Sequence, residues 1–311
     1  MGNDVLVSVY CATFNHENYI AEALDSILMQ KVDFPIEILV GEDCSTDKTR
    51  EILKKYEENH PGRLTVFYRD HNMYKEVPNN GLDLKMRCRG KYVIALEGDD
   101  FWIDENKLQK QADFLENHSD YIAVAHNCVV VDKDSNPTGE LFRECKQTEY
   151  TFSHYASEIM PGQTATFMAR NAYKDHLFDL SFMDFPVPPG DRRMYFTYLA
   201  HGRIYCIQES MSAYRHIVTG GSSYSANLRH DFSKSLKWHE AQLTYAMKVG
   251  NPEAIKCAEL MYCLTVRDGM KRREISIRDG LKKISMIGNK TYFSMAKRDI
   301  NRFILHKELD I

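Results

Sequence analysis

The sequence predicts an α/β fold in which helices flank a mostly parallel sheet, followed by an all-helical C-terminal part. Short apolar segments rich in β-branched residues are typical of strands buried on both faces. These segments alternate with helical segments of about a dozen residues, a pattern that gives right-handed β-α-β units. From residue 227 onward the strand-like segments stop and the spacing is helical. We therefore expect one domain over residues 1–226 and a helical region over 227–311.

The individual elements follow from apolar spacing and from turn residues. Strands are expected over Val5–Thr13, Ile36–Val40, Leu64–Tyr68, Tyr92–Leu96 and Tyr121–Val131. Helices are expected over Tyr19–Met29, from a cap at Ser45, Thr46 or Asp47 to Asn59, over Asn79–Arg89, Glu105–Asn117, from Asp191 to about Ala200, and over Leu228–Lys248, Pro252–Arg267 and Tyr292–Ile304. The proline-rich segment Asp184–Gly190 cannot continue a helix or a central strand. The segment Met160–Met168 reads as a turn that enters a strand.

Composition excludes several classes of protein. The 311 residues are 43% hydrophobic and 27% charged, and a net charge of -4 gives no reason to expect nucleic acid as a partner. The eight cysteines are scattered, without a Cys-x-x-Cys pair or zinc spacing, which favours reduced thiols in a cytoplasmic protein. No apolar stretch is long enough to span a membrane, and no signal peptide opens the sequence.

Polar clusters follow three of the predicted strands. They are Thr13–Asn15, Glu42–Asp43, and Glu97 with Asp99 and Asp100. Parallel strands carry their ligand crevices at the carboxyl edge, so the clusters are expected to converge there. Adjacent acids repel each other, and a hard divalent cation shared with phosphate oxygens would relieve the repulsion. Each cluster alone could be helix capping, but capping explains their convergence poorly.

Glycine-rich phosphate loops are absent. The turn after the first strand, CATFNHENY, has no glycine, so it cannot be the dinucleotide fingerprint, and the GxxxxGK[ST] pattern does not occur. Phosphates would therefore have to be held by a metal ion at Asp99 and Asp100. Asp43 can accept a hydrogen bond from a base or a ribose hydroxyl, but a carboxylate does not easily contact a phosphate.

Three stretches, CATFNHENYIAEALDSIL, VGEDCSTDKTREIL and KYVIALEGDDFW, resemble the conserved stretches of family 2 glycosyltransferases. The resemblance runs from about Val5 to His216 and does not specify the sugar. It implies the GT-A fold, a single α/β domain that binds a nucleotide-sugar. It also implies an inverting transferase that uses a nucleotide-activated sugar, usually UDP-linked, with Mg2+ or Mn2+.

The resemblance assigns roles to the three polar clusters. Thr13, Phe14 and Asn15 would line the nucleotide pocket, with Phe14 near the base. Asp43 would bind the uracil or the ribose. Asp99 would face the ribose and the metal, and Asp100 would be the main metal ligand. Glu97 stands where many relatives carry the first Asp of a D-x-D motif, so a ligand and a hydrogen-bond acceptor behind the ligands both stay open.

The resemblance also assigns roles in the second half. Asp191 would be the catalytic base, with a plain helix N-cap as the alternative. Arg215 would contact the diphosphate, and His216 would complete the metal shell or be a structural histidine. The segment Gly220–Ser222 would act as a lid. The region of Gln163 and Thr164 would face the acceptor, although ordinary turn chemistry is the better interpretation of these two residues.

The helical C-terminal region is basic. Between Arg267 and Lys307 it carries twelve Lys or Arg and four Asp or Glu, a surplus of eight positive charges. Three uses stay open: a cap on the catalytic domain, a contact with an anionic membrane surface, or a homodimer contact. A membrane contact would suit a lipid-linked saccharide acceptor and a peripheral location at the inner face of the cytoplasmic membrane.

The function expected is transfer of a sugar from a nucleotide-sugar to a hydroxyl of a saccharide or lipid-linked saccharide, in surface polysaccharide synthesis. A sugar-nucleotide nucleotidyltransferase is one rival, and it should show a glycine-rich basic loop after the first strand. A non-catalytic nucleotide- or sugar-binding protein on the same scaffold is the other, and it would not need Asp100 or Asp191. The Gln-x-x-Arg-Trp signature of processive relatives is missing, which favours addition of single sugars.

Overall fold

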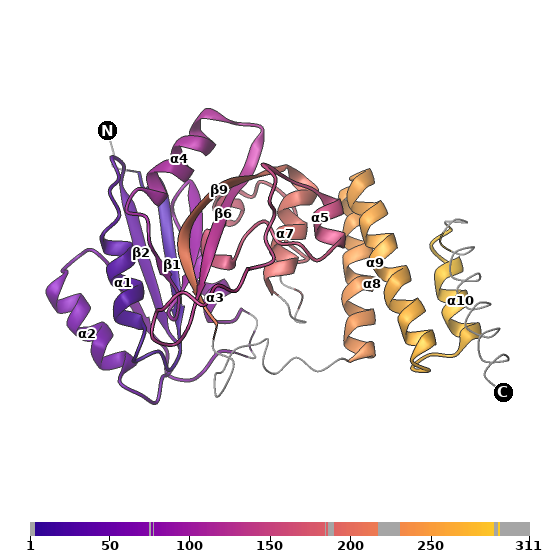
Figure 1. The fold of residues 1–311 in the computed structure, drawn as a ribbon, viewed down its shortest axis with the longest axis horizontal. Coiled ribbons are helices and arrows are strands. Elements are labelled where there is room, and N and C mark those ends of the chain that lie inside the picture. The colour runs from indigo at the N-terminus through magenta and orange to yellow at the C-terminus, as the bar shows by residue number, and fades with distance from the viewer. Residues whose placement is uncertain are drawn as a thin grey trace. The chain divides into compact units, whose positions relative to one another are not determined.

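The structure, a computed structural model, describes residues 4–74, 76, 78–183, 185, 190–216, 231–288 and 292. The chain forms two compact units, one of Met1–Pro186 with Gly190–Ala226 and one of Val187–Pro189 with Asn227–Ile311. The first unit is built around a sheet and the second is helical (Figure 1). The predictions of a lid at Gly220–Ser222 and of a helix over Tyr292–Ile304, and most of the proline-rich segment, lie outside the described residues.

The first half of the sheet is parallel, as predicted. Its strands lie in the order β3 (Thr65–Tyr68), β2 (Ile36–Glu42), β1 (Val7–Thr13) and β4 (Tyr92–Glu97). In this register Thr13 pairs with Glu42, and Ala12 pairs with Glu97. The three strands therefore end almost level, and the polar residues that follow them meet at one edge.

The second half of the sheet is mixed. Strand β8 (Met168–Arg170) pairs antiparallel with both β4 and β6 (Tyr121–Val131), and β9 (Arg203–Arg215) runs parallel to β6. The short strands β5 (Phe101–Trp102) and β7 (Glu149–Tyr150) pair antiparallel with β9. Strands of two residues carry no periodicity that a sequence pattern can detect, which explains why β5 and β7 were not predicted, whereas β8 lies where the turn at Met160–Met168 was expected to enter a strand.

Alternate residues of the strands face two helical layers. One layer contains α1 (Ile20–Leu28), α2 (Thr49–Asn59) and α4 (Lys107–Asn117), and the other contains α3 (Asn80–Arg87). The first core joins strand residues to helix residues and includes Val9, Cys11, Ile94, Leu96, Ile20, Leu24, Leu53 and Leu108. The second, smaller core joins Leu84 of α3 to Leu39 and Val93. The sheet is thus covered on both faces, and its carboxyl edge remains available for a site.

The remaining elements of the first unit follow β6. They are α5 (Phe152–Ala156), a 3-10 turn (Thr164–Thr166), α6 (Ala172–Asp175) and α7 (Gly190–His201). Helix α7 is buried over most of its length, from Met194 to Ala200. Its first turn carries Asp191, so this residue stands on a firmly packed helix as the sequence predicts.

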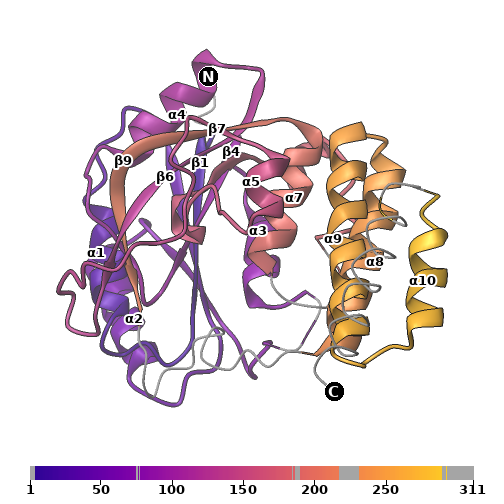
Figure 2. The same cartoon turned by 45° about the vertical axis from the view of Figure 1, so that its right-hand side comes forward.

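The second unit contains α8 (Phe232–Val249), α9 (Pro252–Lys271) and α10 (Ile277–Ser285), which lie side by side (Figure 2). Gly250 ends α8 in the left-handed conformation, and Asn251 caps α9 by accepting from the N–H groups of Glu253 and Ala254. A core of Tyr262, Val266, Met270 and Ile284 joins α9 to α10. Within the described ranges, every helix is too short or too polar to span a lipid bilayer.

Candidate active site

Four residues, Glu97–Asp100, form a turn at the end of β4 that we call the acidic turn. Carboxylate oxygens of Glu97, Asp99 and Asp100 all lie within 4.8 Å of one another. The chain can turn this tightly because residue 98 is glycine: a Cβ there would lie 2.6 Å from Oγ1 of Thr13. Among the described residues this is the one group of three or more acids, histidines or cysteines close enough to share a metal ion.

The electrostatics of the acidic turn favour a cation. Desolvation raises the pKa of Glu97 to about 8, helped by the negative charges of Asp99 and Asp191, although one side of Glu97 is open to solvent. Desolvation, followed by the charges of Asp99 and Glu97, also raises the pKa of Asp100 well above its usual value. Three hard oxygen donors that repel each other fit a divalent cation such as Mg2+ or Mn2+. Glu97 is therefore placed to be a ligand as well as an acceptor.

Asp100 is held in a fixed orientation from both sides. Its side chain is 2% exposed, Oδ2 accepts from Nε2 of Gln163 at 2.7 Å, and Oδ1 accepts from the backbone N–H of Arg215 at 2.8 Å. Gln163 also accepts from the N–H of Ala165, so it starts the 3-10 turn and orients Asp100 at once. Each carboxylate oxygen keeps a second lone pair for a metal ion.

Arg215 has different partners from the diphosphate that the resemblance assigns to it. Its side chain is 1% exposed, and Nε donates to the carbonyl of Asp99 at 2.8 Å. The two terminal nitrogens donate to the carbonyl of Asp132 at 2.9 Å, to Oγ of Ser135 at 3.1 Å and to Oε2 of Glu22 at 2.6 Å. The guanidinium also lies over the ring of Tyr19, 4.4 Å from its centroid. In this structure Arg215 fixes the acidic turn, and its contact with a diphosphate stays a prediction.

Two histidines lie near the acidic turn. Nε2 of His16 is 3.8 Å from Oδ2 of Asp99, and Nδ1 of His16 is 3.2 Å from Oγ1 of Thr13. His216 follows Arg215 but its Nδ1 contacts Oε2 of Glu140 at 2.8 Å, and it is not part of the group around the three acids. The sequence suggested His216 as the histidine beside the metal ligands. In the structure it is His16 that lies beside Asp99.

Asp191, in the first turn of α7, influences the acidic turn electrostatically. Its negative charge is close enough to Glu97 to raise the pKa of that carboxyl. Burial raises the pKa of Asp191 as well, and the N–H and the positive charge of Arg192 lower it in part. Oδ1 accepts from the N–H of Arg192 at 2.7 Å, so the carboxylate sits at the start of α7 as an N-terminal acid does. Asp191 therefore combines a place in the first turn of α7 with an electrostatic influence on the acidic turn.

The loops after β1 and β2, residues 14–19 and 43–48, bind each other and are called here the paired loops. The N–H groups of Asn15 and Glu17 donate to Oγ of Ser45 at 3.0 Å and Oδ2 of Asp47 at 3.0 Å. In return Oδ1 of Asn15 accepts from the N–H of Thr46 at 2.8 Å. Ser45 and Asp47, two of the residues predicted to cap the helix to Asn59, thus accept hydrogen bonds from the neighbouring loop. Asp47 also accepts from the N–H of Thr49.

The predicted nucleotide residues line the base of the paired loops. Thr13 is 2% exposed at the end of β1, Phe14 is half-buried and Asn15 is exposed with φ of 57°. Asp43 is buried, and Oδ1 accepts from the N–H of Met73 at 2.8 Å while burial raises the pKa of the carboxyl. Because the N–H of Asp43 donates to the carbonyl of Thr13, the two strand ends are joined directly.

Sequence analysis assigned no role to His16 or Glu22, and for Gln163 it favoured ordinary turn chemistry over a place facing the acceptor. Gln163 orients Asp100, Glu22 holds Arg215, and His16 lies beside Asp99. His16 could have been found, because it follows the first strand at the predicted edge. Gln163 and Glu22 carry no such signal, since their partners are more than sixty residues away in the sequence.

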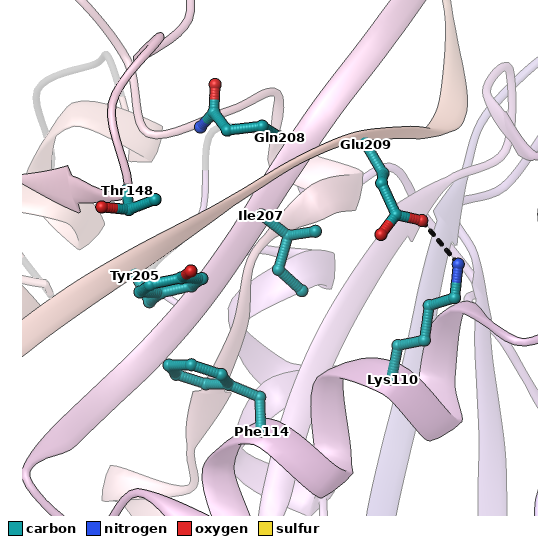
Figure 3. Close-up of a pocket in the computed structure, with 7 residues that line it drawn as sticks. All are labelled: Lys110, Phe114, Thr148, Tyr205, Ile207, Gln208 and Glu209. Atoms are coloured by element: carbon teal, nitrogen blue, oxygen red, sulfur yellow. Dashed lines mark hydrogen bonds and ion pairs between the residues drawn. The ribbon is translucent and has the colours of Figure 1, made fainter.

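A cavity of about 510 Å³ lies on the early part of β9, away from the acidic turn and the paired loops. It is lined by Lys110, Phe114, Thr148, Tyr205, Ile207, Gln208 and Glu209 (Figure 3). Phe114 stacks on Tyr205 with ring centroids 4.3 Å apart, and Nζ of Lys110 pairs with Glu209 at 2.6 Å. Glu209 and Arg215 are six residue steps apart along β9, about 20 Å of strand, so this cavity does not belong to the acidic turn.

Comparisons with known proteins bear on the first unit. The family model "Glycosyl transferase family 2" matches residues 8–177. Uncharacterized proteins of Mycobacterium tuberculosis are 28% identical over 220 residues, which is 69% of this chain and 60% of theirs. The poly(ribitol-phosphate) beta-N-acetylglucosaminyltransferase TarS of Staphylococcus aureus is 35% identical over 121 residues, 38% of this chain and 20% of TarS. The chain thus spans 60% or less of the length of these curated relatives.

Solved structures share the fold. The structure of TarS residues 1–349 with UDP-GlcNAc superposes with a TM-score of 0.63 at 17% identity and covers 93% of this chain and 83% of that one. The mannosyltransferase PcManGT from Pyrobaculum calidifontis, solved with GDP-Man and Mn2+, gives a TM-score of 0.52 at 16% identity, covering 96% and 87%. At such low identity the likeness concerns the fold alone.

Proposed function

The chain belongs to glycosyl transferase family 2, and from that premise we propose that it transfers a sugar from a UDP-sugar to a hydroxyl of a saccharide or lipid-linked saccharide. One observation carries the proposal. Asp99 of the acidic turn lies 3.8 Å from His16 of the paired loops, which also supply Asn15 and Asp43, and the charge of Asp191 in α7 raises the pKa of Glu97. Transfer from a nucleotide-sugar needs three adjacent parts: an edge that binds the base and ribose, a site for the diphosphate, and a carboxylate near the anomeric carbon that takes the proton of the acceptor hydroxyl.

The donor side of the proposal assigns the nucleotide to Thr13, Phe14, Asn15, Asp43 and Asp99. TarS, whose structure contains UDP-GlcNAc, supports a UDP-linked donor, and PcManGT, solved with GDP-Man, supplies the alternative nucleotide. Asp99 and Asp100, with Glu97 beside them, would hold Mg2+ or Mn2+. A cation there would offset the negative charge that the nucleotide diphosphate gains as it leaves. Arg215 acts in this proposal by holding the acidic turn.

The acceptor side assigns the base to Asp191. A sugar hydroxyl is a weak nucleophile until its proton is removed as the new bond forms. Asp191 takes that proton, the hydroxyl oxygen bonds to the anomeric carbon, and the bond from that carbon to the nucleotide breaks on the opposite side. The configuration at the anomeric carbon is therefore inverted. The raised pKa of Asp191 suits this role, because a carboxylate with a higher pKa is a stronger base.

The setting of the reaction is proposed from the relatives and from the C-terminal charge. TarS acts on poly(ribitol-phosphate) by its name, which supports a role in a surface polymer. The basic residues of the second unit support a peripheral contact at the inner face of the cytoplasmic membrane, where lipid-linked acceptors are found. Addition of single sugars is proposed because the processive signature is missing.

Thermal unfolding with nucleotides tests the donor half of the proposal. Purified protein is melted with UDP, GDP, CDP or dTDP, each with Mn2+ or with EDTA. A ligand that binds only the folded state raises the melting temperature by mass action. We expect UDP with Mn2+ to give the largest rise and EDTA to remove it. A larger rise in melting temperature with GDP would mean that the donor is GDP-linked and would leave the location of the site unchanged. If no nucleotide raises the melting temperature with any metal, the donor site assigned here is wrong.

A further inference from the structure

The cavity on the early part of β9, called here the β9 cavity, contains the end of a column of aromatic rings (Figure 3). The ring of Phe114 in α4 stacks on His118 and on Tyr205, with the centroids 4.3 Å apart in each pair and interplanar angles of 17° and 25°. Tyr121 stands beside these three rings at angles of 69°, 84° and 89°, and it lies closest to the middle ring, Phe114. Among the described residues no further ring covers the outer face of Tyr205, so the column ends there.

A β-bulge aims consecutive side chains of β9 into the cavity. The pairing of β9 with β6 shifts register after Ile207, and the next two residues, Gln208 and Glu209, have no partner residue in this pairing. In a regular strand successive side chains alternate between the two faces of the sheet, but here all three line the cavity. Nε2 of Gln208 donates to the carbonyls of Cys206 at 2.9 Å and Gln147 at 3.0 Å, which leaves Oε1 as an acceptor. Bulges that re-aim side chains in this way are frequent beside functional sites.

The polar groups around the β9 cavity offer no surplus of positive charge. Lys110 and Glu209, the two charged residues that line it, pair with each other at 2.6 Å. Lys110 also pairs with Asp104 at 2.8 Å. An anionic ligand such as a nucleotide would therefore meet two acids that already share this lysine. The hydroxyl groups of Thr148 and Tyr205 can donate and accept, and within the described residues neither has a hydrogen-bond partner.

We propose that the β9 cavity binds a neutral saccharide. A pyranose ring has a face of C–H groups, which packs on an open aromatic face, and an edge of hydroxyl groups, each of which donates and accepts hydrogen bonds. The outer face of Tyr205 matches the first, and the hydroxyl of Thr148 with Oε1 of Gln208 matches the second. The volume of about 510 Å³ lies within the range of about 300–1,000 Å³ that is typical of small-ligand sites.

Binding in the β9 cavity rests on the proposed function only in its purpose, which is to hold one part of a long saccharide acceptor while its end reaches the acidic turn. About 20 Å of β9 separates Glu209 from Arg215, so a single sugar cannot occupy both places. Saccharide binding in the cavity needs neither a nucleotide nor a metal ion. It is therefore measurable with EDTA present and without any donor.

Calorimetric titration of the full chain with maltotetraose, cellotetraose and chitotetraose, in EDTA, tests the proposal. Thr148 is exposed and lies on the side of Tyr205 away from Phe114 (Figure 3), so Thr148→Trp should fill the cavity without disturbing the core. We expect at least one tetrasaccharide to bind, and Thr148→Trp to weaken that binding at least tenfold. The matched control is Thr65→Trp, which changes an exposed threonine of β3 and should bind like the unmodified chain. If no tetrasaccharide binds, or if Thr148→Trp binds as well as the control, the proposal is wrong.

Two variants of Tyr205 test the stacking contact. Tyr205→Val removes the ring and should weaken saccharide binding about tenfold, because the apolar contact with the C–H face is lost. Tyr205→Phe keeps the ring and loses only the hydroxyl, so it should bind within about threefold of the unmodified chain. Equal loss in both variants would contradict stacking on Tyr205. The melting temperature of each variant checks that it is folded.

Uridine tests the rival ligand, a base stacked on Tyr205. If uridine binds more tightly than the tetrasaccharides and Thr148→Trp removes that binding, the cavity is a nucleoside site and the proposal falls. The response of the melting temperature to UDP and Mn2+ keeps the two proposals apart, since it should be the same in Thr148→Trp as in the unmodified chain. Saccharide binding that Thr148→Trp removes would support the β9 cavity even if no nucleotide stabilised the chain.

Discussion

The paired loops and the acidic turn lie at the same edge of the sheet but treat their polar groups differently. In the paired loops nearly every backbone N–H and side-chain acceptor named above has a partner in the neighbouring loop. In the acidic turn Glu97 and Asp99 repel each other, and the carboxylate of Asp99 lies 3.8 Å from Nε2 of His16. The satisfied region is a rigid frame, and the region with excess negative charge is where a bound cation gains most.

The largest effect is expected when one acid of the acidic turn is removed, because this region depends on a bound cation and the paired loops do not. Asp100→Asn keeps the shape of the side chain and its hydrogen bond from the N–H of Arg215, but loses the charge and the hydrogen bond from Gln163, because an amide NH2 group cannot accept. A nucleotide with Mn2+ at 100 times its dissociation constant stabilises the folded chain by about 2.7 kcal/mol, and we expect the variant to lose that stabilisation. Thermal unfolding with and without EDTA measures it. A variant that still responds to Mn2+ would show that Asp100 is not a ligand.

Asp191 should separate chemistry from binding. Asp191→Asn leaves the paired loops and the acidic turn unchanged, so we expect the thermal response to UDP and Mn2+ to persist. The transfer rate should fall by about 10² to 10⁴, the usual contribution of a positioned general base. The measurement is kcat with a saturating donor. If Asp191→Asn instead leaves kcat intact, the base lies elsewhere.

Arg215 tests whether the acidic turn depends on its support. Arg215→Met removes the donors to Asp99, Asp132 and Glu22, and charged hydrogen bonds of this kind are each worth roughly 1.5–3 kcal/mol. Glu22 is partly exposed, so we expect the free energy of unfolding to fall by about 3 kcal/mol in total. Urea unfolding measures the change, and the response to Mn2+ should weaken with it.

Two further variants make the Arg215 test specific. Arg143→Met removes an exposed arginine whose ion pair with Glu158 is 3.8 Å long, and such pairs contribute about 0–1 kcal/mol. Arg215→Lys keeps the positive charge beside Glu22. A lysine ammonium cannot make all the hydrogen bonds of the planar guanidinium to Asp99, Asp132 and Glu22, so this variant should restore only part of the stability. An Arg215→Met variant that is as stable as the unmodified chain but loses transfer activity would show that Arg215 binds the diphosphate of the donor.

The difference between the two regions also explains what the sequence could predict. The ends of β1, β2 and β4 were predicted to meet, because short apolar strands with polar ends place their side chains at one edge whatever the rest of the chain does. The acids that carry the chemistry follow those strands directly. Local sequence therefore contained most of the candidate site, namely Thr13–Asn15, Asp43 and Glu97–Asp100.

The supports of the site depend on distant contacts that no local pattern records. The family resemblance assigned Arg215 to the diphosphate. Its real environment is set by β9, which runs beside β6 and brings the guanidinium between Tyr19 and Phe101. Gln163 reaches Asp100 because β8 joins the sheet as an antiparallel strand between β4 and β6. Both facts require the tertiary structure.

The smallest effect is expected in the paired loops, at Asn15. Its Oδ1 accepts from Thr46, and its φ of 57° is a conformation that asparagine tolerates better than alanine. Asn15→Ala loses both advantages and should lower the free energy of unfolding by about 1–2 kcal/mol. Asn15→Gly keeps the backbone conformation free of strain and loses only the acceptor, so the difference between the two variants measures the strain.

The effect of Asn15 on transfer should be equally modest. A loop that holds the nucleotide contacts the ground state and the transition state alike, so both Asn15 variants should raise KM for the donor severalfold with kcat unchanged. A fall in kcat would mean that the paired loops tighten during the reaction and are not the rigid frame described above. Because the acidic turn is fixed through Gln163 and Arg215 and not through Asn15, the response to Mn2+ should survive in both variants.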